Sequence, residues 1–333
     1  MEKEITTNNN STYALRFQSK LGPYDFPFTL NPTIGCFYTC KYCFSPNVLW
    51  KERKEFFNKV EIKVNVPELL KKELSKLSWI PQHLKRVQIN EANDIYHPLV
   101  LNYMRDELKR DIMLEILDTF NDADKSGNHW ILHILTKSNL VTTHIDTLAK
   151  MNHMVQVEMS FSSADEKQSR KVELYTPTIE KRLETISALD ERNIFVRVMA
   201  MPFKGSLEEV IAFRENTIKC GAKAFKHKEL NYFSWADVEN ISEKSLFNDE
   251  LLRSGSKKDR HFDDVIIKSG EYYIENQKPL FVEVQLPVFK NSKGKNQDWT
   301  VRPNNVERLI KKDVQTINCG YTEISEIDWN YIK

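Results

Sequence analysis

Segments typical of strands alternate with segments typical of helices through most of this chain, and this order limits the possible folds more than any other feature. Strands are expected at 25–32, 84–90, 129–136, 154–162, 193–201 and 222–230. Helices are expected at 66–77, 105–120, 141–151, 176–192 and 206–221. Because strands that alternate with helices at this spacing form parallel βα units, the pattern predicts an α/β fold built on a partial (β/α)6 TIM-like barrel.

The two ends of the chain lie outside this alternation. Residues 1–24 are interpreted as an N-terminal extension and residues 25–230 as the barrel. Residues 231–333 are interpreted as a C-terminal α/β region that closes the open side of the barrel or helps to recognise the substrate. Within that region, helices are expected at 235–252 and 303–313 and a strand at 279–289.

Charge and hydropathy narrow the range of partners. The chain has 48 basic and 47 acidic side chains, and this balance gives no overall attraction to nucleic acid or to an anionic membrane. Its first residues, MEKEITTNNNSTY, lack the apolar core of a secretory signal. No run of about 18 apolar residues occurs, so no membrane span is expected. These features predict a cytoplasmic protein in a reducing compartment.

Three of the five cysteines, Cys36, Cys40 and Cys43, stand together in the stretch NPTIGCFYTCKYCFSP. Disulfides do not explain an odd number at such short spacing. A structural zinc site needs four ligands, and the nearest histidine pair, His129 and His133, is interpreted as core or strand-end residues. Three thiolates on one loop suit a 4Fe-4S cluster that leaves one iron open. A zinc-stabilised binding module and an iron–sulfur electron carrier are the alternatives.

The C-x3-C-x2-C spacing, with Tyr42 directly before the last cysteine, resembles the cluster loop of the radical S-adenosylmethionine (radical SAM) superfamily. The stretches NDIYHP, ILTKSNLV, VELYTPTIEKRLETISAL and RVMAMP then follow in the order typical of the branch that includes spore photoproduct lyase. The resemblance covers about residues 26–205 and implies a barrel of the radical SAM type. It also implies that the three cysteines bind a 4Fe-4S cluster. The enzyme would cleave S-adenosylmethionine reductively and generate a 5′-deoxyadenosyl radical for hydrogen abstraction on an unidentified substrate.

The resemblance and the ends of the predicted strands together indicate which residues contact the cofactor. Lys137 directly follows a buried apolar run, and a charge at such a position is costly unless an anion lies beside it. The carboxylate of the methionine part of S-adenosylmethionine would be that anion. The expected cofactor-binding residues are Tyr42, Glu91, Asn93, Asp94, Lys137, Ser160, Ser162, Glu173 and Arg182. Tyr42 and Tyr96 are the candidate catalytic side chains. Structural alternatives are a snorkelling lysine, turn-forming serines, and a salt bridge for Glu173 or Arg182.

The resemblance also implies partners and a reaction class. Such an enzyme, a lyase or a modifying oxidoreductase, needs an electron donor such as flavodoxin or ferredoxin. Kinship to spore photoproduct lyase suggests a nucleotide or nucleic acid as substrate, and repair of DNA photoproducts is an alternative function. However, spore photoproduct lyase is understood to quench its product radical with a further cysteine, and this chain has none between Cys43 and Cys220. We therefore expect a different substrate.

Overall fold

The structure of the protein is a computed structural model that describes residues 3–18, 27–43, 45–80, 85–204 and 207–227, together with five short strands further along the chain. The helices expected at 235–252 and 303–313 lie outside the described residues. The strand expected at 279–289 is described in two parts. Pro279 ends β12 (Lys278–Pro279), and β13 (Val282–Pro287) pairs with β15 (Thr316–Tyr321) in a separate sheet.

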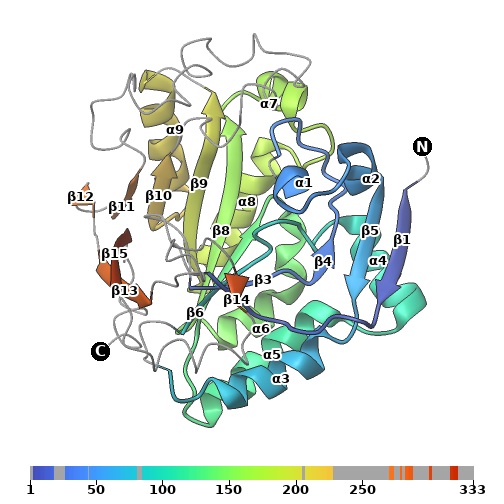
Figure 1. Ribbon diagram of the computed structural model, residues 1–333. Coiled ribbons are helices and arrows are strands. Elements are labelled where there is room, and N and C mark those ends of the chain that lie inside the picture. Colours follow the sequence, from blue (N-terminus) through green and yellow to red (C-terminus); the bar gives the residue numbers. More distant parts are fainter. Residues whose placement is uncertain are drawn as a thin grey trace, which may run out of the picture.

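A ten-stranded sheet forms the centre of the described protein (Figure 1). Six of its strands are parallel neighbours in chain order: β3 (Phe28–Leu30), β6 (Arg86–Ile89), β7 (Ile131–Thr136), β8 (Val155–Ser163), β9 (Phe195–Lys204) and β10 (Ala224–His227). Antiparallel strands extend the sheet at both edges, namely β2 (Arg16–Gln18), β14 (Thr300–Val301), β11 (Gly270–Tyr273) and β12 (Lys278–Pro279). The predicted α/β class and the six parallel strands of a partial barrel are confirmed.

A helix precedes each later strand of the parallel set, as the pattern predicted. These helices are α3 (Val66–Lys76), α5 (Ile112–Lys125), α6 (Ile145–Lys150), α8 (Ile179–Asp190) and α9 (Leu207–Lys219). Figure 1 shows α3 and α5 packed beside each other. Shorter helices lie in the connections, namely α1 (Ser45–Val48), α2 (Arg53–Asn58), α4 (Pro98–Tyr103) and α7 (Glu166–Val172).

Two of the expected helices are interrupted. The helix expected at 105–120 is divided into a π-helical segment, η2 (Met104–Leu108), and α5. Between them Lys109 adopts a left-handed φ of 52°, which ends the first segment, and Asp111 caps the second through a hydrogen bond from the Leu114 N–H at 3.0 Å. The helix expected at 141–151 starts as a 3-10 segment, η3 (Asn139–His144), before α6.

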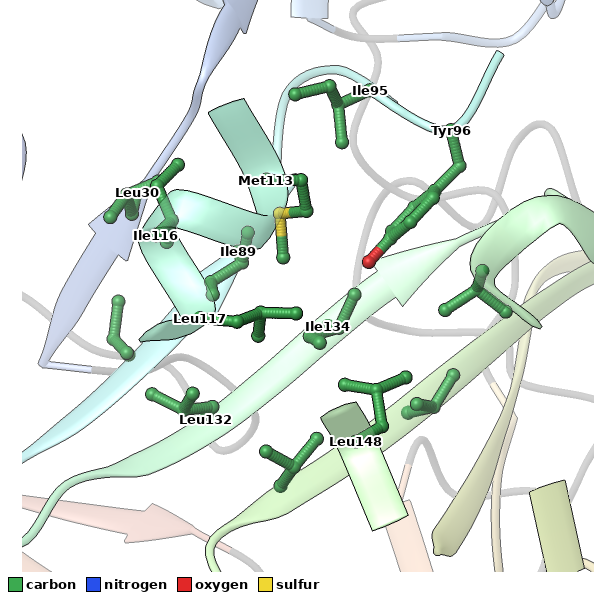
Figure 2. Close-up of a cluster of buried hydrophobic side chains, with 14 of the residues drawn as sticks. Leu30, Ile89, Ile95, Tyr96, Met113, Ile116, Leu117, Leu132, Ile134 and Leu148 are labelled. Carbon is green, nitrogen blue, oxygen red and sulfur yellow. The ribbon is translucent and has the colours of Figure 1, made fainter. Parts of the chain in front are cut away.

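The two faces of the parallel sheet differ in polarity. On the helix-covered face, Ile89 and Ile134 meet Met113 and Leu117 of α5 in a buried apolar cluster (Figure 2). Successive side chains alternate between the faces of a strand. The opposite face therefore carries the polar side chains of the same strands, and these are also buried: Arg86, Gln88, His133, Gln156, Glu158 and Arg197. His133 is thus a core residue, as expected, and the interior of the barrel is polar.

A second sheet of three strands leads into the cysteine loop. Its strands are β1 (Glu4–Asn8), β5 (Lys59–Lys63) and β4 (Thr33–Ile34), with β1 parallel and β4 antiparallel to β5. Figure 1 shows β1 and β5 side by side at the right of the view. Part of the segment interpreted as an N-terminal extension is therefore paired with chain that follows the cysteines. Among the described residues, the helices are too short or too polar to cross a lipid bilayer.

Candidate cluster and cofactor site

The cysteine loop lies at the carboxyl end of the parallel strands, close to the residues that follow β7 and β8. Gly35, directly before the first cysteine, has a φ of 91°, and a Cβ atom added there would lie 2.0 Å from the backbone oxygen of Lys59. Only glycine fits this close approach. The next N–H, that of Cys36, donates to the backbone oxygen of Phe56 at 3.1 Å. The start of the loop is therefore fixed against the chain around β5.

The middle of the loop is fixed by a segment far along the chain. Cys40 forms an isolated antiparallel bridge with Glu173, and the Lys41 N–H donates to the backbone oxygen of Val172 at 2.8 Å. Within the loop, the Cys43 N–H donates to the backbone oxygen of Cys40 at 3.1 Å. The end of α7 thus holds the central cysteine in place.

Arg53, at the start of α2, holds the same loop from another side. Its Nη1 donates to the backbone oxygen of Cys43 at 2.7 Å, and its Nη2 donates to those of Lys41 at 2.8 Å and Cys40 at 3.5 Å. Arg53 belongs to the charged stretch KERK, which carries no sequence signal for such a role. The sequence therefore did not indicate that Arg53 belongs to the site.

The three thiols are close enough to influence one another. Burial raises the pKa of Cys36, and the neighbouring Asp94 and Cys43 add to the rise. Burial also raises the pKa of Cys40. Lys137 lowers this pKa, whereas Glu173 and the other two thiols raise it further. Since iron binds thiolates, the loading of a cluster has to release protons from these groups.

The donor set can be compared with the group that the resemblance implies. Within the part of the chain that the structure describes, no three His, Cys, Asp or Glu side chains converge on a site for a single metal ion. Three neighbouring thiols on one loop, with Cys40 buried and Cys36 and Cys43 partly exposed, are the ligand type and number that suit a 4Fe-4S cluster with one open iron. The residues present therefore fit the cluster.

Glu173 is the centre of a buried network behind the loop. Its Oε1 accepts a short hydrogen bond from the hydroxyl of Tyr42 and lies 3.7 Å from Nζ of Lys137, while its Oε2 lies 2.9 Å from Nη1 of Arg182. Burial alone raises the pKa of this carboxyl, but Arg182 and Lys137 lower it to about 2. Glu173 is therefore an anion that joins the cysteine loop to the ends of β7 and α7 and to α8.

Lys137 has partners within the chain itself. Its Nζ donates to the hydroxyl of Ser160 at 2.6 Å, and its longer contact with Glu173 supplies the anion that the sequence required. The relative solvent exposure of the Lys137 side chain is 15%. Because an ammonium has three donors, Lys137 retains the capacity to bind a further carboxylate.

The carboxylate of Asp94 accepts several hydrogen bonds from the chain around it. It accepts hydrogen bonds from the Thr136 hydroxyl at 2.9 and 3.0 Å, from the Lys137 N–H at 2.9 Å and from the Tyr96 N–H at 3.1 Å. Burial raises its pKa to about 6, although these hydrogen bonds act in the opposite direction. Asp94 thus ties the chain after β6 to the end of β7.

Tyr96 belongs to the apolar core of the protein. Its ring lies in the apolar cluster beside Ile134 and Met113 (Figure 2), and its hydroxyl is 3.3 Å from Nδ1 of His144. The side chain is fully buried. Of the two candidate catalytic tyrosines, only Tyr42 is in the network around the loop.

The remaining predicted residues lie at the same end of the sheet. Asn93 donates to the backbone oxygen of Thr33 at 2.8 Å, and Glu91 is partly exposed. The Ser162 hydroxyl and both amide atoms of Asn90, a residue that was not among those predicted, are buried and have no hydrogen-bond partner in the described structure. Asn90 also has a left-handed φ of 65°. A buried polar atom without a partner is costly unless a ligand or a water molecule bonds to it, so both side chains have hydrogen-bonding capacity for a bound group.

Comparison with the sequences of known proteins identifies the family of this chain. The family model described as Radical SAM superfamily matches residues 30–215. An uncharacterized protein of Methanocaldococcus jannaschii is 26% identical over 267 residues, which are 74% of this chain and 93% of the relative. An uncharacterized protein of Mycobacterium tuberculosis is 28% identical over 183 residues, which are 53% of this chain and 49% of the relative. The chain thus spans about half the length of the mycobacterial protein.

Solved structures show the same fold. A spore photoproduct lyase variant superposes with a TM-score of 0.55 at 12% identity, covering 92% of this chain and 76% of that one. Another variant, with bound AdoMet and dinucleoside spore photoproduct, gives a TM-score of 0.52 at 14% identity, covering 79% and 68%. The family model covers more than half of the sequence, and the fold agrees with it. This chain belongs to the radical SAM superfamily.

Proposed function

We propose that this protein is a radical SAM enzyme that holds a 4Fe-4S cluster through Cys36, Cys40 and Cys43 and uses S-adenosylmethionine to abstract hydrogen from a second substrate. The observation that carries the proposal is the grouping of these three thiols on one loop that distant segments fix, with Nζ of Lys137 5.6 Å from the ring centroid of Tyr42 in the same loop. When bound, the cluster and S-adenosylmethionine supply the electron and the organic radical that break an inert C–H bond.

The residues of the chain bind and orient the cofactor in this proposal. Lys137 donates to the carboxylate of the methionine part while Ser160 keeps its side chain in place. Glu91 and Asn93 meet the amino group, and Ser162 meets a hydroxyl or carboxylate. Tyr42, buried against Glu173, excludes water from one wall.

Glu173, Arg182 and Asp94 contribute in a different way. Glu173 and Arg182 are fully buried and bonded to each other, and Asp94 is bonded to Thr136 at the end of β7 and to Tyr96 in the chain after β6. We therefore assign these three residues to positioning the loop and Lys137, rather than to direct contact with the cofactor.

The proposal extends to the division of the chain and to its partners. Residues 25–230 form the barrel that carries the chemistry, and residues 231–333 complete the site or recognise the substrate. The protein works in the cytoplasm with a flavodoxin or ferredoxin as electron donor. A nucleotide or nucleic acid is the substrate class suggested by the fold neighbours, since a spore photoproduct lyase structure holds a dinucleoside.

Anaerobic reconstitution with iron and sulfide tests the proposal. We expect about four irons per chain and, under dithionite, release of 5′-deoxyadenosine from S-adenosylmethionine. Cys36→Ala, Cys40→Ala and Cys43→Ala should each abolish this release, whereas Cys220→Ala, the matched control, should retain it. Full release in any one of the three loop variants would overturn the cluster assignment. A stable cluster that never cleaves S-adenosylmethionine would instead indicate an electron carrier.

A further inference from the structure

The guanidinium of Arg53 is surrounded by backbone oxygens of the cysteine loop. It donates to the carbonyls of Cys43 and Lys41 at 2.7 and 2.8 Å and reaches that of Cys40 at 3.5 Å. On its other side the guanidinium lies 5.2 Å from the ring centroid of Phe57. Arg53 therefore connects the second and third cysteines of the loop to α2.

This arrangement depends on the shape of the arginine side chain. Carbonyl dipoles that point to one place repel each other unless a donor lies between them. A guanidinium presents five N–H groups in a planar fork and can serve several acceptors at once. A lysine ammonium carries the same charge but lacks the rigid fork, so it cannot reproduce this geometry.

The charge of Arg53 has a second consequence. In the described part of the chain, its hydrogen bonds go to neutral backbone oxygens rather than to a carboxylate. Its positive charge therefore acts on the surroundings of Cys40 and Cys43 without being cancelled by an ion pair. A nearby cation stabilises the more negative, reduced form of an iron–sulfur cluster, and net charge is one of the factors that set cluster potentials.

We propose that Arg53 is a positioning residue for the cluster: its guanidinium holds the backbone oxygens of Cys40, Lys41 and Cys43 so that the cysteine loop keeps its shape, and its charge raises the midpoint potential of the cluster. The inference rests on the proposed function and assigns a role to a residue outside the ligand set. The inference assigns two separate effects to Arg53. The planar guanidinium, with its fork of N–H groups, holds the cysteine loop, and the positive charge sets the midpoint potential of the cluster.

Two substitutions distinguish the fork from the charge. Arg53→Lys keeps the charge and removes the fork, whereas Arg53→Gln removes the charge. Lys54→Gln is the matched control, since it removes one positive charge from an exposed side chain of the same helix. Hydrogen exchange of the Lys41 and Cys43 amides, measured in the apoprotein, reports on the loop.

The second measurement is the midpoint potential of the reconstituted cluster, from a redox titration followed by electron paramagnetic resonance. Arg53→Lys should speed exchange of both amides at least ten-fold and leave the potential near that of the parent. Arg53→Gln should lower the affinity for the electron about ten-fold, which is about 59 mV for a one-electron couple. Lys54→Gln should change neither.

Unchanged amide exchange in Arg53→Lys would overturn the role of the fork, and an unchanged potential in Arg53→Gln would overturn that of the charge. If the parent protein binds no cluster, the proposed function fails, while the exchange measurement still decides whether Arg53 holds the loop. If Arg53→Gln does not fold, Arg53→Lys alone decides. A midpoint potential near that of the parent, together with fast exchange of the Lys41 and Cys43 amides, supports the proposal. A strongly lowered midpoint potential in Arg53→Lys contradicts it.

Discussion

Glu173 and Arg182 form an ion pair in which both side chains are buried, with 2.9 Å between Oε2 and Nη1. The same guanidinium donates to the backbone oxygen of Ser160 at 2.8 Å, so the pair links α8 to the end of β8. The other carboxylate oxygen reaches Tyr42 in the cysteine loop. A single buried pair thus joins three segments around the site.

Removal of one partner of this pair should strongly destabilise the protein. Arg182→Met leaves the Glu173 carboxylate buried without its main counter-charge, and a loss of about 3–5 kcal/mol in the free energy of unfolding is expected. Urea denaturation of the apoprotein measures it. The double variant with Glu173→Gln should recover part of the loss.

The control for this prediction is Asp106→Ala, which removes the exposed ion pair with Arg105. It should leave the unfolding curve nearly unchanged, since exposed pairs contribute little. An Arg182→Met protein as stable as the parent would show that the buried pair does not hold the fold together.

Substitution of Lys137 should weaken cofactor binding more than it weakens the fold. Lys137→Ala removes one charge-assisted hydrogen bond to the carboxylate of S-adenosylmethionine, a loss of about 1.5–3 kcal/mol in binding free energy. Calorimetry on reconstituted protein measures the dissociation constant. Lys150→Ala, at an exposed position on α6, is the control and should bind as the parent does. An unchanged constant in Lys137→Ala would limit this residue to its contacts with Ser160 and Glu173.

Glu73 should make the stability depend on pH. Its carboxylate accepts hydrogen bonds from the N–H groups of Ala14 and Leu15 at 2.8–3.1 Å, and burial raises its pKa from 4.5 to about 7, although these bonds and Lys76 lower it. The folded state therefore binds this proton more tightly than the unfolded state. The stabilising effect of protonation is full below pH 4.5 and is lost as the pH rises towards 7.

The variant Glu73→Gln tests this effect, because it cannot titrate. As the pH rises from 4.5 to 8, the unfolding free energy of the parent should fall by about 3 kcal/mol relative to that of Glu73→Gln. A difference of one unit in pKa corresponds to about 1.4 kcal/mol. Denaturation of both proteins at the two pH values gives this difference and cancels the titration of other groups. Parallel pH profiles for the two proteins would contradict the raised pKa.

The protein should not repair spore photoproduct. No cysteine lies between Cys43 and Cys220, and Cys220 follows the end of α9, which is the end remote from the carboxyl edge of the parallel strands. The chain between the cysteine loop and Cys220 therefore contains no hydrogen donor of the required type. Given the dinucleotide spore photoproduct, the reduced enzyme should release 5′-deoxyadenosine without forming thymidylyl-thymidine, as chromatography would show. Multiple turnovers to the repaired dinucleotide would contradict this prediction.

The sequence predicted the parallel strands well, because buried parallel strands are short apolar runs and the helices between them have a clear period. It did not predict β1 and β5, whose residues EITTN and KVEIK are largely polar and lie at the edge of the fold. Whether such polar segments form strands depends on the neighbouring strand with which they pair, and local composition does not show this.

The sequence indicated candidate site residues one by one but not the network that they form. Lys137, Glu173 and Arg182 were each expected to contact the cofactor, yet their contacts with one another depend on pairings between distant segments that no local spacing records. Arg53 was missed for the same reason, since its acceptors are backbone oxygens, which every residue has. Tyr96 follows β6, but its side chain turns to the helix-covered face.

The link between Tyr42 and Glu173 has a consequence for the order of events during synthesis. The two residues are 131 positions apart, so at about 5–20 residues per second a ribosome needs roughly 7 to 26 seconds to pass from the first to the second. Throughout that interval the nascent chain presents three thiols without the segment that holds Cys40. If the protein carries the cluster proposed above, iron delivery is useful only after the end of α7 has emerged, so cluster insertion would follow translation of at least the first 173 residues.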